Sequence, residues 1–160
     1  NMSVNIAGVE LKNPVTVASG TFGSGMEYGE YVDLNRLGAV TTKGVANIPW
    51  PGNPTPRIAE TYGGMMNAIG LQNPGLDTFV KRDIPFLKQY DTKIIVNVCG
   101  KSEADYVDAV EKLGEQPVAF LKSISHALMS KREELLSDRF HLLQRLLLRR
   151  LRRFQSSRLL

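Results

Sequence analysis

Three stretches decide the fold: Val15-Thr16-Val17-Ala18-Ser19-Gly20, Ala39-Val40-Thr41-Thr42-Lys43-Gly44 and Lys93-Ile94-Ile95-Val96-Asn97-Val98. Each is a short run of mostly β-forming residues, and the first two are followed by glycine-containing turns, which is typical of a buried strand. Segments with helical spacing lie between and after them. The alternation predicts an α/β protein built from parallel βα units, arranged as an open sheet or a closed barrel.

Helices are predicted over Glu27–Leu37, Asp77–Gln89 and Ser102–Leu113, from the spacing of their apolar residues. Pro85 must interrupt or kink the second of them, because proline lacks the backbone N–H of a helix interior. Ser102 is the expected N-cap of the third. At the N-terminus, short β-type runs on either side of Ala7-Gly8 predict a hairpin.

The segment Val45–Pro74 is rich in Pro, Gly, Asn and Thr and is too long for a passive connection. It follows the end of a strand, where α/β folds place their ligands. We therefore predict that it is a substrate loop.

Composition limits the class of protein. The chain has 160 residues, of which 42% are hydrophobic, so it can bury a core. The single cysteine, Cys99, excludes an internal disulfide, and no Cys/His cluster indicates a metal site, which together favour the cytoplasm. Neither a signal peptide nor a run of about 18 apolar residues is present, so secretion and membrane spanning are not expected.

Polar side chains fall at the ends of the predicted strands: Ser19, Lys43 and Asn97. A lysine there can neutralise an anionic cofactor or a carboxylate, and an asparagine can both donate to and accept from a flat heterocycle. Singly, each has an ordinary explanation as a solvated lysine or a turn-forming asparagine. Their combination predicts a ligand site.

These residues belong to a longer series of motifs that resembles the class 1 dihydroorotate dehydrogenase family. Asn67–Gly75, with the sequence NAIGLQNPG, is the most specific of them. The order and spacing fit the family throughout residues 3–118. The other matching strings are Asn13-Pro14, Ala18-Ser19-Gly20, Thr42-Lys43-Gly44, Gly52-Asn53-Pro54-Thr55-Pro56-Arg57 and Asn97-Val98.

The resemblance implies a TIM barrel that holds FMN at the carboxyl ends of its strands, with dihydroorotate stacked over the flavin. We expect Ser19, Lys43, Asn67 and Asn97 to converge on one concave face. The positions that match FMN contacts are Ser19, Lys43, Gly44 and Asn97. The positions that match the substrate-binding segment are Lys43, Asn67, Ala68, Ile69, Gly70 and Leu71.

The Gly52–Arg57 loop and the sequence as a whole resemble the B type of the family. This type implies a homodimer and a partner subunit that carries FAD and a 2Fe-2S cluster and passes electrons to NAD. In the family's reaction a loop cysteine removes a proton from dihydroorotate. Cys99 does not match the position of that cysteine, and we interpret it as a small buried residue.

Residues 119–160 differ in composition from the rest of the chain. Residues 1–118 hold 10 Lys and Arg against 13 Asp and Glu, together with all 14 Gly and all 8 Pro, whereas residues 119–160 hold 10 basic residues against 3 acidic ones. Their leucine and arginine spacing predicts a basic amphipathic helix. Such a tail could bind polyanions without sequence specificity.

A second interpretation of residues 119–160 is a shift of reading frame. Synonymous codons exist for Lys122–Arg139 such that translation from the third base of the Leu121 codon gives EINISCPNVKEGGIAFGQ. This string contains the Asn-Ile-Ser-Cys-Pro-Asn motif that the family resemblance requires here. On this hypothesis the chain encodes about three of the eight barrel units, lacks the catalytic cysteine and is inactive.

Two other functions remain open at this point. The chain could be a non-enzymatic fragment that binds polyanions through its basic tail. It could also descend from a related flavoenzyme that reduces pyrimidines, because reduction and oxidation of the same ring use similar sites.

Overall fold

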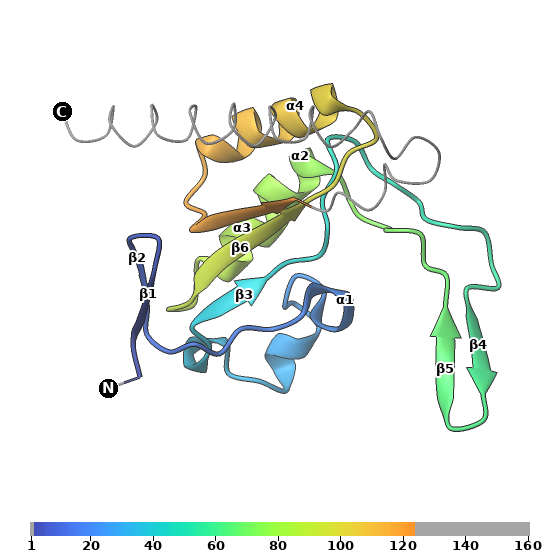
Figure 1. Ribbon diagram of the computed structural model, residues 1–160, viewed down its shortest axis with the longest axis horizontal. Helices are drawn as coiled ribbons and strands as arrows, with labels where there is room; N and C mark the ends of the chain where they lie inside the picture. Colours follow the sequence, from blue (N-terminus) through green and yellow to red (C-terminus); the bar gives the residue numbers. More distant parts are fainter. Residues whose placement is uncertain (1, 124–160) are drawn as a thin grey trace.

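The computed structural model describes residues 2–123, and the predicted tail from residue 124 onward lies outside these residues. Its centre is a parallel sheet of three strands in the order β3-β6-β7. These strands are β3 (Ala39–Thr41), β6 (Lys93–Val98) and β7 (Phe120–Ser123). Figure 1 shows helical segments packed along one side of this sheet and an antiparallel hairpin projecting away from it. The βα order and the parallel pairing agree with the sequence prediction.

The sheet register follows directly from the strand sequences. Val40 lies opposite Ile94, and Val96 lies opposite Leu121. Val40, Ile94 and Val96 are buried. Parallel strands are usually covered on both faces, which explains why their sequences are near-continuous apolar runs. Phe120–Ser123 falls within the range that was assigned to the tail, yet it forms the third strand of the sheet.

The core lies between the sheet and two helical segments, residues 76–87 and α4 (Glu103–Gly114). Phe79 and Leu87 of the first segment and Tyr106 and Leu113 of α4 are buried within it. Ser102 caps α4: its hydroxyl accepts a hydrogen bond from the Asp105 N–H, and Asp105 bonds back to the Ser102 N–H. The N-cap at Ser102 is the one predicted from sequence, and the reciprocal bond from Asp105 completes a capping box.

The predicted Asp77–Gln89 helix is formed by three consecutive pieces, α2 (Leu76–Thr78), a π-helical turn η3 (Phe79–Asp83) and α3 (Ile84–Leu87). Pro85 stands in the first turn of α3. Since proline cannot donate a hydrogen bond, the wider turn before it accommodates the break. The predicted interruption at Pro85 is therefore confirmed.

Two predicted elements are wrong. Glu27–Leu37 is not one helix but two 3-10 turns, η1 (Tyr28–Glu30) and η2 (Leu34–Arg36). The Asp33 side chain accepts a hydrogen bond from the Asn35 N–H, and this local cap starts a new turn in place of a continuous helix. Val15–Ala18 is not a buried strand: it makes one bridge, from Thr16 to Ala39, and Val15 is 49% exposed.

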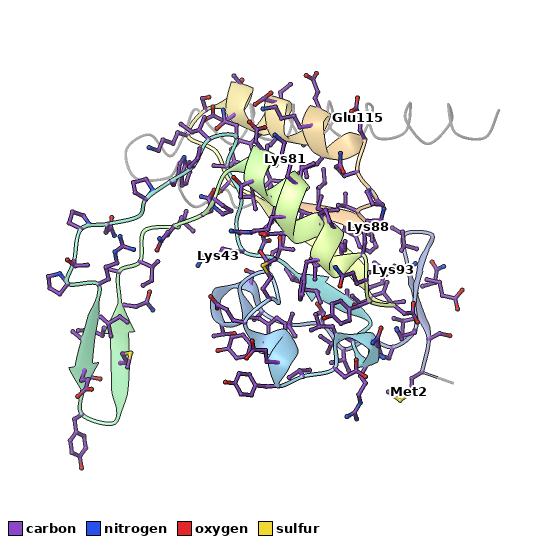
Figure 2. The ribbon with its side chains drawn as sticks, turned by 180° about the vertical axis from the view of Figure 1, so that it is seen from behind. Met2, Lys43, Lys81, Lys88, Lys93 and Glu115 are labelled. Carbon is purple, nitrogen blue, oxygen red and sulfur yellow. The ribbon has the colours of Figure 1, made fainter. Side chains whose placement is uncertain are left out.

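The predicted N-terminal hairpin is present as β1 (Val4–Ile6) and β2 (Val9–Leu11). It lies near the amino ends of the parallel strands. Figure 2 shows Lys93, the first residue of β6, at that end of the sheet, and Lys43, which follows β3, on the side that faces the projecting hairpin.

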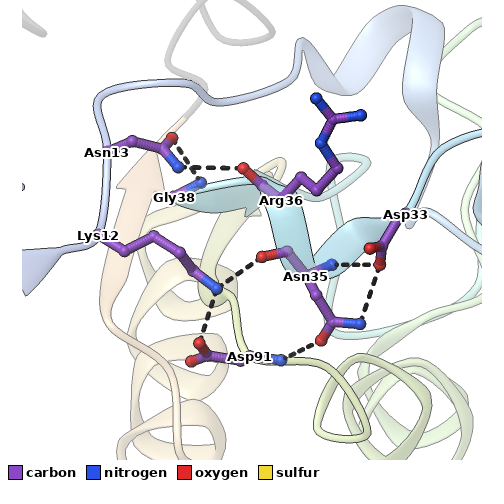
Figure 3. Close-up of polar contacts among 7 residues, drawn as sticks. All are labelled: Lys12, Asn13, Asp33, Asn35, Arg36, Gly38 and Asp91. Atoms are coloured by element: carbon purple, nitrogen blue, oxygen red, sulfur yellow. Dashed lines mark hydrogen bonds and ion pairs between the residues drawn. The ribbon is translucent and has the colours of Figure 1, made fainter. Parts of the chain in front are cut away.

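A polar network joins the chain after β2 to the turns before β3 (Figure 3). Lys12 Nζ lies 2.8 Å from Asp91 Oδ2 and donates to the Asn35 carbonyl at 2.7 Å. The Lys12 ammonium lowers the pKa of the Asp91 carboxyl. Asn13 donates to the Arg36 carbonyl, and its Oδ1 accepts from the Gly38 N–H. These contacts fix where β3 begins.

The predicted substrate loop contains an antiparallel hairpin that the sequence did not reveal, β4 (Ile58–Thr61) and β5 (Gly64–Asn67). We call residues 47–75 the ribbon. All residues of both strands are exposed, including Met65 at 62% and Met66 at 62%. Figure 1 shows that the hairpin end of the ribbon stands clear of the sheet.

Candidate functional site

The site begins at the carboxyl ends of β3 and β6. Asn97, near the end of β6, is 1% exposed, and its amide nitrogen donates to Ser19 Oγ at 2.7 Å and to the Thr42 carbonyl at 2.9 Å. Ser19 comes from α1 (Ser19–Phe22), more than seventy residues away in sequence. The ends of β3 and β6 meet because parallel strands end at a common edge, and Ser19 reaches this edge from the start of α1.

Asn97 has an unused acceptor in this cluster. Its Oδ1 is buried and has no hydrogen-bond partner among the described residues. A buried polar atom without a partner costs free energy, of order 1–3 kcal/mol. The Asn97 oxygen is thus suited to accept a hydrogen bond from a ligand N–H.

Lys43 and Gly44 lie directly after β3, next to Thr42. Lys43 is half-buried and Gly44 is buried. The backbone continues alongside β6, because the Val45 N–H donates to the Asn97 carbonyl at 2.9 Å and the Cys99 N–H donates to the Val45 carbonyl at 3.0 Å. Lys43 therefore brings positive charge to the edge where Asn97 and Ser19 meet.

Cys99 is fully buried, in agreement with its interpretation as a packing residue. Burial raises the pKa of its thiol to about 11, and the nearby Lys43 ammonium offsets only part of that rise. A thiol with so high a pKa carries little thiolate at neutral pH and is a poor base or nucleophile.

The buried thiol leads to a prediction on reactivity and stability. In the folded chain, alkylation of Cys99 by iodoacetamide at pH 8 should be at least about tenfold slower than in urea. Because the folded pKa lies above the unfolded value of 9.0, the unfolded state loses its proton first, and stability should fall as pH rises from 9 towards 11. Mass spectrometry of the alkylated protein measures the first effect and urea titrations measure the second. Equal alkylation rates with and without urea would contradict the burial of Cys99.

The structure brings together Ser19, Lys43, Gly44 and Asn97 but not Asn67. Asn67 ends β5, where it pairs with Ile58 and is exposed. Figure 1 places that strand away from the ends of β3 and β6. The expected convergence of all four side chains is therefore wrong for Asn67, because the ribbon forms its own two-stranded sheet.

The rest of the substrate-motif segment, Ala68–Leu71, lies in the arm of the ribbon that follows β5. Ala68 and Gly70 are exposed, and Ile69 and Leu71 are half-buried. The arm that precedes β4 binds this segment: the Ala68 N–H donates to the Arg57 carbonyl at 2.8 Å, and the Asn53 N–H donates to the Ile69 carbonyl at 3.0 Å. The two arms thus form a ladder that extends beyond the β4–β5 hairpin.

Sequence reasoning missed one buried polar residue at the base of the ribbon, Asn73. It is 6% exposed and makes three side-chain hydrogen bonds, to the Ala46, Leu71 and Gly75 backbones. Its position inside the NAIGLQNPG motif, followed by Pro-Gly, was a signal of a constrained turn.

Within residues 2–123, no group of His, Cys, Asp and Glu is arranged to hold a metal ion. In the same part of the chain, no helix is long and apolar enough to cross a bilayer.

Parallel βα units with a polar cluster at the strand ends define an α/β protein with a candidate ligand site at the carboxyl edge of its sheet. A profile of the dihydroorotate dehydrogenase family matches residues 1–125, so the chain belongs to this family. The dihydroorotate dehydrogenase B (NAD(+)) catalytic subunit of Lachnoclostridium phytofermentans is 73% identical over 122 residues. The protein of the same name from Alkaliphilus metalliredigens is 70% identical over 122 residues.

The match covers only part of these relatives. It takes in 76% of this chain, 41% of the Lachnoclostridium protein and 40% of the Alkaliphilus protein. A crystal structure of DHODH from Eimeria tenella, in complex with ferulenol, has the same fold over 76% of this chain and 36% of its own length, with a TM-score of 0.57 and 23% sequence identity. The chain therefore spans about two fifths of the relatives it matches.

Proposed function

We propose that this chain carries the N-terminal part of the active site of a dihydroorotate dehydrogenase, which oxidises dihydroorotate to orotate in pyrimidine biosynthesis. The observation that supports this most directly is the Asn97 cluster, with its free buried oxygen, beside Lys43 at the strand ends. The proposal also draws on the names of the relatives.

Ser19, Lys43, Gly44 and Asn97 would hold FMN. Their chemistry suits a flavin, because an unpartnered amide oxygen can accept from a ring N–H and an ammonium can balance the charge of a reduced ring. When bound, FMN would supply the hydride acceptor. The residues of this chain supply binding and orientation.

Lys43 and Asn67–Leu71 would bind the substrate. The Lys43 ammonium would pair with the carboxylate of dihydroorotate, and the Asn67 amide would form paired hydrogen bonds with the ring. Since Asn67 stands away from Lys43 in this structure, use of both residues on one substrate requires that the ribbon lie over the strand ends. The parts of a complete barrel that Asn67 would then contact are not among the described residues.

The proposed enzyme is of the B type, cytoplasmic and dimeric. Its electrons would pass to NAD through a partner subunit with FAD and a 2Fe-2S cluster, since the relatives are named as NAD(+)-type catalytic subunits. The family's proton-abstracting cysteine has no counterpart in residues 1–118. We attribute its loss to a shift of reading frame within residues 119–160, a range whose described part is β7.

A restored chain tests the proposal. Residues 1–118 are joined to the corresponding C-terminal part of the Lachnoclostridium catalytic subunit, and the product is compared with the 160-residue chain. The restored protein should purify with FMN absorbance and oxidise dihydroorotate with an artificial electron acceptor. The 160-residue chain should do neither, because loss of the base alone costs of order 10²–10⁴-fold in rate and an incomplete flavin site removes the acceptor.

Two outcomes would contradict the proposal. A folded restored protein without flavin and turnover would refute the enzyme assignment of residues 1–118. Stoichiometric FMN and turnover in the 160-residue chain would refute the frameshift hypothesis. Salt-sensitive binding of the 160-residue chain to heparin, without flavin, is expected of the basic tail alone.

A further inference from the structure

Asn73 occupies the point where both arms of the ribbon meet the sheet. Its side-chain oxygen accepts from the Ala46 N–H at 3.1 Å and from the Gly75 N–H at 3.0 Å. Its side-chain nitrogen donates to the Leu71 carbonyl at 2.9 Å. Its backbone forms a two-way bridge with Trp50, in which each N–H donates to the other carbonyl at 3.1 Å. Every polar group of this residue is thus in use.

These bonds join the two segments that carry the proposed substrate contacts. Ala46 lies three residues after Lys43, and the intervening Val45 is fixed to β6 through the Asn97 carbonyl. Leu71 ends the proposed substrate segment. We call Lys43–Ala46 the Lys43 arm; the Asn73 side chain bonds both to this arm, at Ala46, and to the Asn67–Leu71 arm, at Leu71.

The bond to Leu71 also supports an unusual backbone. Leu71 has φ +53° and Gly70 has φ +78°. A left-handed conformation costs a residue with a side chain about 1 kcal/mol or more, so Leu71 needs a compensating contact. The Asn73 amide supplies one by donating to the Leu71 carbonyl.

Neighbouring backbone leaves little freedom for another arrangement at this point. A Cβ at Gly75 would lie 2.7 Å from the Pro49 nitrogen, and a Cβ at Gly70 would lie 2.7 Å from the Asn53 nitrogen. The Leu76 N–H donates to the Ala46 carbonyl at 2.9 Å and closes the base of the ribbon. Asn73 sits inside this closed base.

We infer that Asn73 is a positioning residue that holds the Leu71 end of the Asn67–Leu71 arm at a fixed place beside the Lys43 arm, so that both segments can serve one substrate when the ribbon lies over the strand ends. Its oxygen orders the Ala46 side and its NH₂ group holds Leu71 in the left-handed conformation. The part of this inference that concerns substrate rests on the proposed function. The hydrogen bonds that join the two arms are present in the fold whether or not a substrate binds. In this role Asn73 touches neither substrate nor cofactor and acts through Ala46, Leu71 and Gly75.

The two halves of the Asn73 amide can be tested separately in the 160-residue chain. Asn73→Asp keeps the acceptor for Ala46 and Gly75 but removes the donor to Leu71, whereas Asn73→Ala removes both. Backbone NMR reports each side: amide hydrogen exchange at Ala46 and Gly75, and the strong intraresidue amide-to-Hα contact that a positive φ gives at Leu71.

We expect exchange at Ala46 and Gly75 to rise about tenfold in Asn73→Ala and to stay within about twofold in Asn73→Asp, as loss or retention of a buried hydrogen bond requires. Both variants should lose the left-handed signature of Leu71. Asn53→Asp is the matched control, because Asn53 donates to the Ala68 carbonyl at 2.9 Å and takes part in none of the side-chain hydrogen bonds of Asn73. It should leave amide exchange at Ala46 and Gly75 unchanged.

A merely structural Asn73 would give a different result. Both variants would then speed exchange in β6 and α4 in the same proportion as at Ala46, and Asp would behave like Ala. That outcome, or a Leu71 signature that survives Asn73→Asp, would overturn the inference.

Ligand binding is read in the same spectra with orotate as the probe. If the proposed function holds, orotate should shift the amides of Lys43 and Leu71 together in the restored protein with FMN bound, and Asn73→Asp should uncouple the two responses. Absence of any orotate response in the restored protein would count against the proposed function. The exchange comparison needs no ligand and decides the role of Asn73 in either case.

Discussion

Gly38→Ala is expected to destabilise the fold by about 3 kcal/mol, the upper end of the range for overpacked sites. A Cβ at Gly38 would lie 1.9 Å from the Asn13 carbonyl oxygen, which is backbone and cannot rotate away. The Gly38 N–H also donates to Asn13 Oδ1 and to the Val15 carbonyl, both at 3.0 Å. Relief of the clash would therefore break the contacts that fix the start of β3 (Figure 3).

Urea unfolding followed by circular dichroism measures this effect, with Gly114→Ala as the matched control. Gly114 ends α4, and a Cβ there would meet nothing within 4 Å. Alanine at that position should be neutral or stabilising by up to about 1 kcal/mol, because glycine is costly in a helix. If both variants unfold at the midpoint of the unsubstituted chain, the close approach of Asn13 to Gly38 is not a feature of the folded protein.

Lys43→Ala is expected to have the largest effect on catalysis in the restored protein. Removal of a preorganised charge from an active site costs of order 10²–10³-fold in rate. We expect kcat/KM for dihydroorotate to fall by about that factor. Lys43→Arg, which keeps the charge but changes its shape, should lose less.

Steady-state kinetics with a fixed electron acceptor measures the loss, and flavin absorbance shows whether the cofactor is still bound. A reduced rate with full flavin content would assign Lys43 mainly to the substrate, and loss of flavin would assign it mainly to the cofactor. A Lys43→Ala protein with full flavin content and unchanged kcat/KM would remove Lys43 from the site.

Local signals explain why much of the sheet was predictable from sequence. The bounds of β6 at Lys93–Val98 follow from a continuous β-forming run, and the cap at Ser102 follows from its spacing to Asp105. The meeting of Lys43 and Asn97 followed from one rule, that parallel strands end at a common edge, whereas Ser19 joins them from α1 and not from the end of the strand that was predicted before it. These predictions needed no knowledge of contacts between distant side chains.

The wrong predictions concern segments whose structure the local sequence pattern does not determine. Glu27–Leu37 shows helical spacing, but the side chain of Asp33 offers a local cap that competes with a continuous helix. Asn67 was expected beside Lys43 because a linear motif does not reveal that its residues form a separate hairpin. The signal for that hairpin was weak: Tyr62-Gly63 separates two short runs, and Gly63 adopts φ +80°. Asn73 was missed because the Pro-Gly after it signals only a turn, whereas its bond to the distant Ala46 backbone is not visible in any sequence pattern.

The hydrogen bond between the Leu76 N–H and the Ala46 carbonyl brings the two ends of residues 47–75 together at 2.9 Å. If residues 47–75 were removed, a short turn would suffice to join Ala46, which follows β3, to Leu76, which begins α2. Chain closure costs little more for a long insertion than for a short one, since it grows as the logarithm of length. The ribbon is in this sense an insertion: β3 and β6 pair with each other without it, and its length adds little to the free energy of closing the chain.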